Sequence, residues 1–339
     1  MFLMGAAALG DICRGLLEGG IKPDTPAVLL MEGTTAHQQR VTATVSTLEG
    51  EARKREVRTP SLIVVGEVCA LADRFAWYEK LPLAGVKVAL TRPEEGMAGM
   101  ALKLRNLGAE VLEAPAVRIL KREPDIPLFK ALREIDTFQW LVFTSPAGVR
   151  IFFEEMRITG ADIRKLGRIR IAVIGRGSAA ELEKRGIFTD LVPEIYDGVH
   201  LGKALAMETG PGDRILIPRA AAGNQELVRA LPGRVIEDIP IYDTVFEEER
   251  PVNWKGELEG GRTDYVMFTS ASTVKGFVHA AGRMDFSVVR AICIGTQTRQ
   301  AADAAGMRTW QAEKADVDSM IDCLLRAHAE EAGKETDIF

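Results

Sequence analysis

Four hydroxyl side chains follow apolar runs at points where the chain turns polar and can begin a helix. They are Ser145 and Ser178, and later Ser270 and Thr298. A serine or threonine at such a point caps a helix, and capping explains each of them alone. Helix amino ends also carry unpaired N–H groups, and ligands of open α/β sheets sit at the carboxyl ends of the strands. We therefore predict that these hydroxyls, with Thr144, contact an anionic ligand.

Tyr242 is the most specific single candidate for chemistry. It lies within a predicted strand, Val235–Val245, near the proposed site. A phenol there is able to act as a hydrogen-bond donor or weak general acid, because its unperturbed pKa of about 10 keeps it neutral at pH 7. A half-buried strand tyrosine is the commoner fate of this residue type. Arg92 and Arg219, each beside a proline at the end of an apolar run, are candidate charge partners for the anion.

These candidates belong to an internal repeat. Three motifs recur: Phe143-Thr144-Ser145 returns as Phe268-Thr269-Ser270, Ile174-Gly175 as Ile294-Gly295, and Thr91-Arg92-Pro93 as Pro218-Arg219-Ala220. The offset is about 120 to 127 residues each time, which indicates two copies of one unit. The copies differ at Tyr242, whose counterpart is Val117. Two like units facing each other would make a cleft lined by the repeated motifs.

Short apolar runs alternate with helical segments over most of the chain after residue 84. The predicted strands there are Val86–Leu90, Glu110–Ile119, Trp140–Phe143, Ile169–Ile174, Arg214–Ile217, Val235–Val245, Tyr265–Phe268 and Val289–Ile294, and the predicted helices include Gly96–Leu107, Asn224–Leu231 and Val317–His328. Such alternation is typical of buried parallel strands in an α/β fold. Residues 1–82 make a thinner unit, with a helix at Gly5–Leu17 and strands at Ala27–Met31 and Ser61–Val65. Residues 331–339 are expected to form a disordered tail.

Composition argues against several classes of protein. A net charge of −5 disfavours nucleic acid or an anionic membrane as partner, because no basic field attracts phosphates. The four cysteines and four histidines are scattered, so we expect no metal, and reduced thiols in a cytoplasmic protein. The glycine turn at Gly175-Arg176-Gly177 lacks the third glycine of the dinucleotide fingerprint. The apolar start of the chain is interrupted at Gly10-Asp11, which does not suit a signal peptide or a membrane span.

From about Gly85 to His328 the chain resembles uroporphyrinogen-III synthases. The resemblance rests on an ordered set of motifs: Thr91-Arg92-Pro93, Phe143-Thr144-Ser145-Pro146, Ile174-Gly175 with Ser178, Ile217-Pro218-Arg219, Tyr242-Asp243-Thr244, Phe268-Thr269-Ser270 and Ile294-Gly295 with Thr298. It implies two flavodoxin-like parallel-sheet domains joined by a two-stranded ladder that contains Val117 and Tyr242. It also implies chain exchange, with residues 84–118 and 247–330 in one domain and residues 119–246 in the other.

The resemblance implies a reaction as well. In this family linear hydroxymethylbilane loses water to give an azafulvene, passes through a spiro intermediate and closes as uroporphyrinogen III with its last ring inverted, without cofactor or metal. Tyr242 matches the tyrosine proposed in the family to assist departure of the hydroxyl. The many carboxylates of this substrate would be bound by Arg92, Thr144, Ser145, Ser178, Arg219, Ser270 and Thr298. The implied enzyme is a lyase of tetrapyrrole biosynthesis, expected to be monomeric.

Residues 1–82 resemble the C-terminal part of uroporphyrinogen-III C-methyltransferases. The matching segments are Met4-Gly5, Thr25-Pro26-Ala27, Gly33-Thr34, Gln39-Arg40 and Val64-Val65-Gly66-Glu67-Val68. The resemblance implies a vestigial S-adenosylmethionine pocket at Met4, Gly5, Pro26, Ala27, Gly33 and Thr34. The glycine-rich N-terminal lobe of that family does not occur in this sequence. We interpret the region as the remnant of a methyltransferase–synthase fusion, not expected to transfer methyl groups, although a complete methyltransferase part would be able to dimerise.

Two other functions stay open at this level. Two α/β lobes about a cleft also describe a non-catalytic ligand-binding module. The first residues alternatively belong to a methyltransferase component that works with a separate first lobe. Product analysis distinguishes a binding module from a synthase, because without catalysis hydroxymethylbilane closes spontaneously to isomer I.

Overall fold

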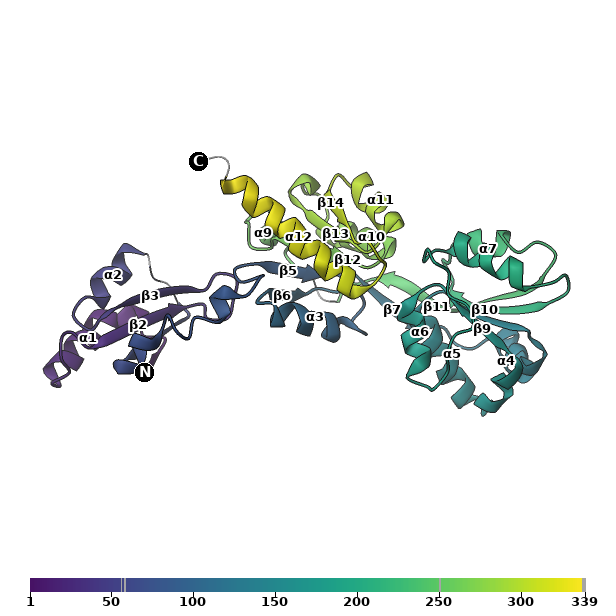
Figure 1. The fold of residues 1–339 in the computed structure, drawn as a ribbon, viewed down its shortest axis with the longest axis horizontal. Helices are drawn as coiled ribbons and strands as arrows, with labels where there is room; N and C mark the ends of the chain where they lie inside the picture. Colours follow the sequence, from purple (N-terminus) through teal and green to yellow (C-terminus); the bar gives the residue numbers. More distant parts are fainter. Residues whose placement is uncertain (56, 58, 250, 337–339) are drawn as a thin grey trace.

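The computed structural model describes residues 1–55, 57, 59–249 and 251–336. Figure 1 shows three α/β units that follow one another along the long axis of the molecule. The N-terminal unit lies at one end, and the middle unit combines strands from early and late parts of the chain. Residues from the centre of the sequence form the far unit at the other end. No helix in these described ranges is long and apolar enough to cross a membrane.

The N-terminal unit is an antiparallel sheet of order β1-β4-β2-β3 covered by two helices. Its strands are β1 (Phe2–Leu3), β2 (Pro26–Met31), β3 (Gln39–Thr44) and β4 (Ser61–Val65), and its helices are α1 (Leu9–Glu18) and α2 (Leu48–Lys54), with 3-10 turns η1 (Ala6–Ala8), η2 (Glu67–Leu71) and η3 (Tyr78–Lys80). The helix predicted at Gly5–Leu17 is thus a 3-10 turn followed by α1. Sequence reasoning missed the strand β3 because it is polar, with only Val41 fully buried.

The middle unit is a parallel sheet of order β14-β13-β12-β5-β6. Its strands are β5 (Lys87–Leu90), β6 (Glu110–Glu113), β12 (Tyr265–Phe268), β13 (Arg290–Cys293) and β14 (Arg308–Gln311), and its helices are α3 (Met97–Asn106), α9 (Trp254–Leu258), α10 (Ala271–Ala281), α11 (Thr296–Ala304) and α12 (Val317–Thr336), with a 3-10 turn η6 (Phe286–Val288). Two apolar clusters fill the two faces of the sheet. In chain order this is the flavodoxin-like 2-1-3-4-5 arrangement.

The far unit is a sheet of order β7-β11-β10-β8-β9, parallel except at β7. Its strands are β7 (Val117–Lys121), β8 (Trp140–Phe143), β9 (Arg170–Val173), β10 (Arg214–Ala220) and β11 (Val235–Phe246), and its helices are α4 (Ile126–Arg133), α5 (Pro146–Ile158), α6 (Arg176–Glu183), α7 (Gly198–Glu208) and α8 (Glu226–Arg229), with 3-10 turns η4 (Ile135–Thr137) and η5 (Ile163–Arg168). The mixed α/β class with parallel sheets, predicted from the apolar runs, is confirmed.

One predicted strand, Glu110–Ile119, is in fact two strands in different sheets. β6 ends at Glu113 in the middle unit, and β7 begins at Val117 in the far unit. Pro115 lies between them, and a proline lacks the N–H group that an uninterrupted ladder needs. The chain returns through β11, whose first part pairs with β10 and whose last residues pair antiparallel with β7. β7 and β11 therefore connect the two units (Figure 1).

The C-terminal helix is longer than predicted, which corrects the expected tail at residues 331–339. α12 continues to Thr336, and the Glu331 carboxylate pairs with Arg290 at 3.3 Å and with Arg308 at 2.6 Å. These two arginines of the middle sheet bind the charged end of the helix. The sequence prediction missed this because it considered only the lack of apolar residues in this segment. The last three residues of the expected tail, 337–339, lie outside the described residues.

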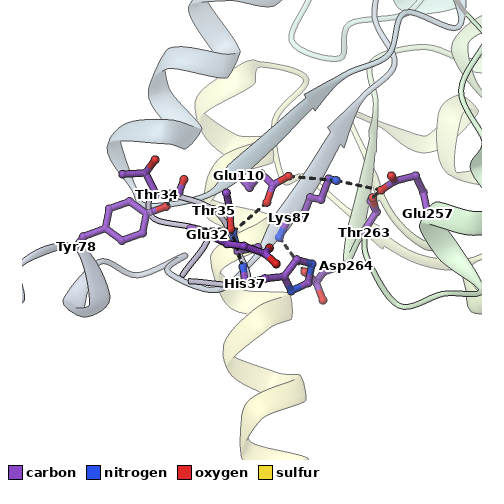
Figure 2. Close-up of polar contacts among 11 residues, drawn as sticks. Glu32, Thr34, Thr35, His37, Tyr78, Lys87, Glu110, Glu257, Thr263 and Asp264 are labelled. Atoms are coloured by element: carbon purple, nitrogen blue, oxygen red, sulfur yellow. Dashed lines mark hydrogen bonds and ion pairs between the residues drawn. The ribbon is translucent and has the colours of Figure 1, made fainter. Parts of the chain in front are cut away.

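A polar junction joins the N-terminal unit to the middle unit (Figure 2). The Tyr78 phenol is shared between the carbonyl oxygens of Thr34, at 3.1 Å, and Gly108, at 3.0 Å. The Glu110 carboxylate accepts the backbone N–H of Ala36 at 2.9 Å. The loop after β2 is therefore bound directly by Glu110 of the middle unit, and Tyr78 links it to Gly108 of that unit.

A mostly buried lysine, Lys87, continues this junction into the middle sheet. The Lys87 ammonium lies 3.1 Å from carboxylate oxygens of both Glu110 and Glu257, and the backbone N–H of Lys87 donates to Asp264 at 2.8 Å. Burial by itself lowers the pKa of Lys87, but the two carboxylates outweigh it and raise the pKa. Lys87 and Glu110 begin β5 and β6. The junction therefore lies at the amino ends of these strands.

Candidate functional site

The four hydroxyl turns lie at the carboxyl ends of parallel strands, as predicted. Ser145 follows β8 and Ser270 follows β12, while Ser178 and Thr298 lie in the first turns of the helices after β9 and β13. Each sheet therefore carries two of these hydroxyls at the carboxyl edge of its strands, where open α/β sheets commonly bind ligands. Thr144, next to Ser145, is half-buried.

Ser145 and Ser270 both cap helices. The Ser145 Oγ accepts the N–H of Gly148 at 3.0 Å, and the Ser270 Oγ accepts the N–H of Thr273 at 3.2 Å. The other two hydroxyls do not cap, since α6 and α11 begin after Gly175 and Gly295. Ser178 and Thr298 are only 2% and 4% exposed. In this conformation the serine caps lie nearer to solvent than these two hydroxyls.

The Tyr242 phenol lies against the first of these caps. Its oxygen is 2.7 Å from the Ser145 Oγ, and the residue is 4% exposed. Burial raises the pKa of Tyr242, while the hydrogen bond to Ser145 and the charges of Arg150 and Arg219 counteract part of that effect. The phenol therefore carries its proton at neutral pH. The structure thus brings two sequence candidates, 97 residues apart, into direct contact.

The backbone explains why Tyr242 reaches this position. β11 pairs in register with β10 as far as Pro240, which lies opposite Arg219, and then shifts so that Tyr242 lies opposite Ala220. Such an irregularity re-aims the side chains that follow it. Tyr242 is also the first residue of β11 that pairs with β7, opposite Lys121. The phenol is therefore placed where β11 leaves one partner strand for another.

Arg92, predicted as a charge partner for the ligand, lies at the carboxyl end of a parallel strand. It follows β5, and its Nε is buried without a hydrogen-bond partner. Its guanidinium lies over Gly96, where an added Cβ would be 2.9 Å from Nη2. Burial and then the positive charge of Arg150 lower the pKa of Arg92. Within the described ranges no carboxylate pairs with Arg92 or with Arg150.

Arg150 is a candidate that sequence reasoning missed. It lies on α5, the helix that Ser145 caps, and its charge acts on both Arg92 of the middle unit and Tyr242 of the far unit. A signal was present in the repeat, because Lys275 occupies the corresponding position after Ser270. A cation after each capped turn suits a ligand that is rich in carboxylates.

Arg219, the second predicted charge partner of the ligand, is already paired within the protein. It is 3% exposed, and its Nε and Nη2 donate to the carboxylate of Asp238 at 2.6 Å and 2.5 Å. Its Nη1 donates to the carbonyl of Asn224 at 2.5 Å. This paired arginine fixes the loop after β10, so its charge is already compensated inside the protein.

The two synthase-like units also touch at the edge that carries the turns. Arg176, from the glycine turn after β9, lies 3.6 Å from Asp316, which precedes α12. Arg176 is well exposed, whereas Asp316 is mostly covered. This ion pair joins the far unit to the middle unit beside two of the candidate turns.

The residues of the vestigial pocket do not all gather in one place. The Met4 N–H donates to the carbonyl of Ser61 at 2.9 Å, and Ser61 pairs with Met31 at the end of β2. Gly5 follows Met4, and Gly33 and Thr34 follow β2, so these four residues share one end of the sheet. Pro26 and Ala27 begin β2 at its other end.

Comparison with known proteins shows the family. A family model described as uroporphyrinogen-III synthase HemD matches residues 98–322. Porphyrin biosynthesis protein HemD of Ruminiclostridium josui is 36% identical over 327 residues, which are 96% of this chain and 65% of that protein. Uroporphyrinogen-III C-methyltransferase of Bacillus subtilis (strain 168) is 29% identical over 210 residues, 61% of this chain and 42% of that protein. Siroheme synthase of Stutzerimonas stutzeri (strain A1501) is 41% identical over 85 residues, 25% of this chain and 18% of that protein.

The chain spans less than two-thirds of the length of these curated relatives. The methyltransferase and siroheme synthase similarities support a fusion that includes the N-terminal part. A crystal structure of a mutant uroporphyrinogen III synthase from Thermus thermophilus has the same fold, with a TM-score of 0.52 at 20% identity over 72% of this chain and 99% of that one. Because the family model covers more than half of its length, the chain belongs to the uroporphyrinogen-III synthase family.

Proposed function

We propose that this protein acts as a uroporphyrinogen-III synthase, a lyase that converts hydroxymethylbilane into uroporphyrinogen III with loss of water and inversion of ring D. The observation that carries the proposal is the 2.7 Å hydrogen bond between Tyr242 and Ser145 at the carboxyl end of β8. Membership of the synthase family supports the same activity. A neutral phenol at this edge is the kind of acid that the first step of the reaction needs.

The first step is departure of the substrate hydroxyl, which leaves as water after it takes a proton. The raised pKa of Tyr242 keeps a proton available at neutral pH. The resulting azafulvene is attacked by the substituted carbon of the last pyrrole, and the spiro intermediate fragments and recloses with that ring inverted. The bilane is flexible, so holding its two ends together supplies a large orientational contribution to the rate.

Carboxylate binding would fall to groups of both units. Our candidates are the unpaired cations Arg92 and Arg150 and the hydroxyls of Thr144, Ser145, Ser178, Ser270 and Thr298. Arg219 would act indirectly, since its guanidinium is bound to Asp238. Several hydroxyls and amides suit a polyanion because each carboxylate needs donors with defined directions.

We also propose the division of the chain that accompanies this function. Residues 84–118 and 247–330 would form one synthase domain and residues 119–246 the other, and residues 1–82 would be the C-terminal part of a methyltransferase lobe. Sheet membership supports the division, except that β7 already begins at Val117. Four free, buried cysteines suit a reducing compartment, and we place the protein in the cytoplasm as a monomer.

Product analysis tests the proposal directly. The purified protein is incubated with enzymatically generated hydroxymethylbilane, and the uroporphyrin isomers are separated after oxidation. Isomer III is expected as the main product. Isomer I alone, as formed without enzyme, would favour a binding module instead.

A Tyr242 variant tests whether this activity depends on the candidate site. Tyr242→Phe is expected to lower turnover by about tenfold or more, because it removes the acid while the apolar ring stays in place. Circular dichroism should show an unchanged fold. Near-normal formation of isomer III by this variant would remove Tyr242 from the mechanism.

A further inference from the structure

The Tyr242 side chain is almost completely buried in this structure, with 4% of its surface exposed. It packs in the apolar cluster of the far unit, which includes Phe143 and Ala147. Within the described residues, its one hydrogen-bond partner is the Ser145 hydroxyl. Ser145 is half-buried and therefore more accessible from solvent than the phenol. Any proton that leaves the phenol must first pass to this serine.

The hydrogen-bond capacity of Ser145 fixes the direction of that path. A serine oxygen accepts two hydrogen bonds and donates one. The N–H of Gly148 fills one acceptor position at 3.0 Å. A buried phenol needs an acceptor for its hydrogen, and Ser145 is the acceptor that the described chain offers to Tyr242. Both acceptor positions are then filled, and the Ser145 hydrogen is left for a group outside the protein.

We propose that Ser145 is the residue that protonates the departing hydroxyl and that Tyr242 resupplies its proton, as a two-residue relay. The inference rests on the proposed synthase function. The Ser145 hydrogen moves to the substrate hydroxyl, the C–O bond breaks with its electrons going to that oxygen, and water leaves. The Tyr242 hydrogen moves to Ser145 at the same time, which leaves a phenolate. The proton released when the inverted pyrrole regains aromaticity returns to Tyr242 along the same path.

The charges around the phenol suit this step. Arg150 on α5 and Arg219 on β10 both act on Tyr242 with positive charge. Arg219 is held by Asp238, whereas Arg150 has no carboxylate partner within the described ranges. A transient phenolate is therefore formed next to at least one uncompensated cation, which stabilises developing negative charge.

Steady-state kinetics of four variants tests the relay. Ser145→Ala and Tyr242→Phe should each lower kcat by about tenfold or more. The double variant should be no slower than the slower single variant, because both changes break one path. Ser145→Thr keeps the hydroxyl and the cap, and it should recover most of the wild-type kcat.

Loss of a helix cap needs its own control. Asp125 caps α4 in the same unit by accepting the N–H of Leu128 at 3.0 Å. Asp125→Ala should lose about 1 kcal/mol of stability, as Ser145→Ala does, yet keep the wild-type kcat. In mixtures of H2O and D2O the wild-type rate should show the curved dependence of two moving protons.

The outcomes separate the relay from the function on which it rests. A kcat for Ser145→Ala equal to that of Asp125→Ala would overturn the relay while the wild type still forms isomer III. A double variant slowed by the product of the two single effects would also overturn it, since the residues would then act independently. Absence of isomer III from the wild type would instead remove the synthase function.

Discussion

Arg92 and Arg219 occupy equivalent positions in the repeat but differ in their ion pairing. Arg219 is neutralised by Asp238 on the neighbouring strand. The residue that corresponds to Asp238 in the other copy is Glu113, and its carboxylate is taken by Arg105 at 2.7 Å. Among the described residues Arg92 therefore has no carboxylate partner, and the charge of Arg150 lowers its pKa further. Two such cations at close range are unfavourable unless an anion lies between them, which is the role that we propose for a substrate carboxylate.

Arg150→Ala tests this role at the level of one side chain. It should raise KM for hydroxymethylbilane by about tenfold, because a charged hydrogen bond to a carboxylate contributes about 1.5–3 kcal/mol. Steady-state kinetics with the purified variant measures the change. Arg157→Ala on the same helix is the control, since Arg157 lies at the exposed last turn of α5. Equal KM values in the two variants would show that Arg150 does not bind substrate.

At the scale of elements, the crossing between β6 and β7 places the two halves of the site. α10 lies against this crossing, and a Cβ on Gly276 would collide with the carbonyl oxygen of Ala116 and lie 2.8 Å from Cγ1 of Val117. Only glycine allows the helix to approach the backbone so closely. Gly99, in the first turn of α3, is exposed and has nothing within 4 Å of an added Cβ.

The same substitution at these two glycines should therefore act in opposite directions. Gly276→Ala should destabilise the protein by about 2 kcal/mol or more, because helix and crossing must move apart. Gly99→Ala should stabilise it by about 0.5–1 kcal/mol, because alanine is the better helix former. Urea unfolding of both variants measures the free energies. A stable Gly276→Ala protein would mean that the crossing is not tightly packed.

At the scale of the whole molecule, the junction and the candidate site lie at opposite ends of β5. Lys87 begins the strand at the junction, and Arg92 follows its far end. The sheet between them is buried and regular, so we expect the two ends to be independent. The N-terminal unit would then be held to the synthase part without taking part in its chemistry.

Tyr78→Phe tests this independence. Losing the phenol bonds to Thr34 and Gly108 should cost about 1 kcal/mol at the junction, and amide hydrogen exchange at Ala36 should become faster. The kcat for isomer III should stay within about twofold of the wild type, as expected for a residue far from the acid. A marked fall in kcat would instead indicate that the N-terminal unit controls the synthase part.

Sequence alone determined the local features of this protein. The apolar runs predicted most strands of both parallel sheets, since a strand buried on both faces is nearly all apolar. The repeat predicted the hydroxyl turns, because each turn is encoded by a few neighbouring residues. The same reliance on apolar runs missed the polar strand β3 and predicted β6 and β7 as one continuous strand.

Only the tertiary structure decided which residues meet. Several of the contacts described above join residues that are separated in the sequence. Examples are the hydrogen bond of Tyr242 with Ser145, the ion pair of Arg219 with Asp238 and the ion pairs of Glu331. No local pattern encodes such pairs, because they depend on how strands are ordered in a sheet and where their register shifts. The sequence supplied the candidate acid, the caps and the cations, and the fold determined which of them are already bound to other groups of the protein.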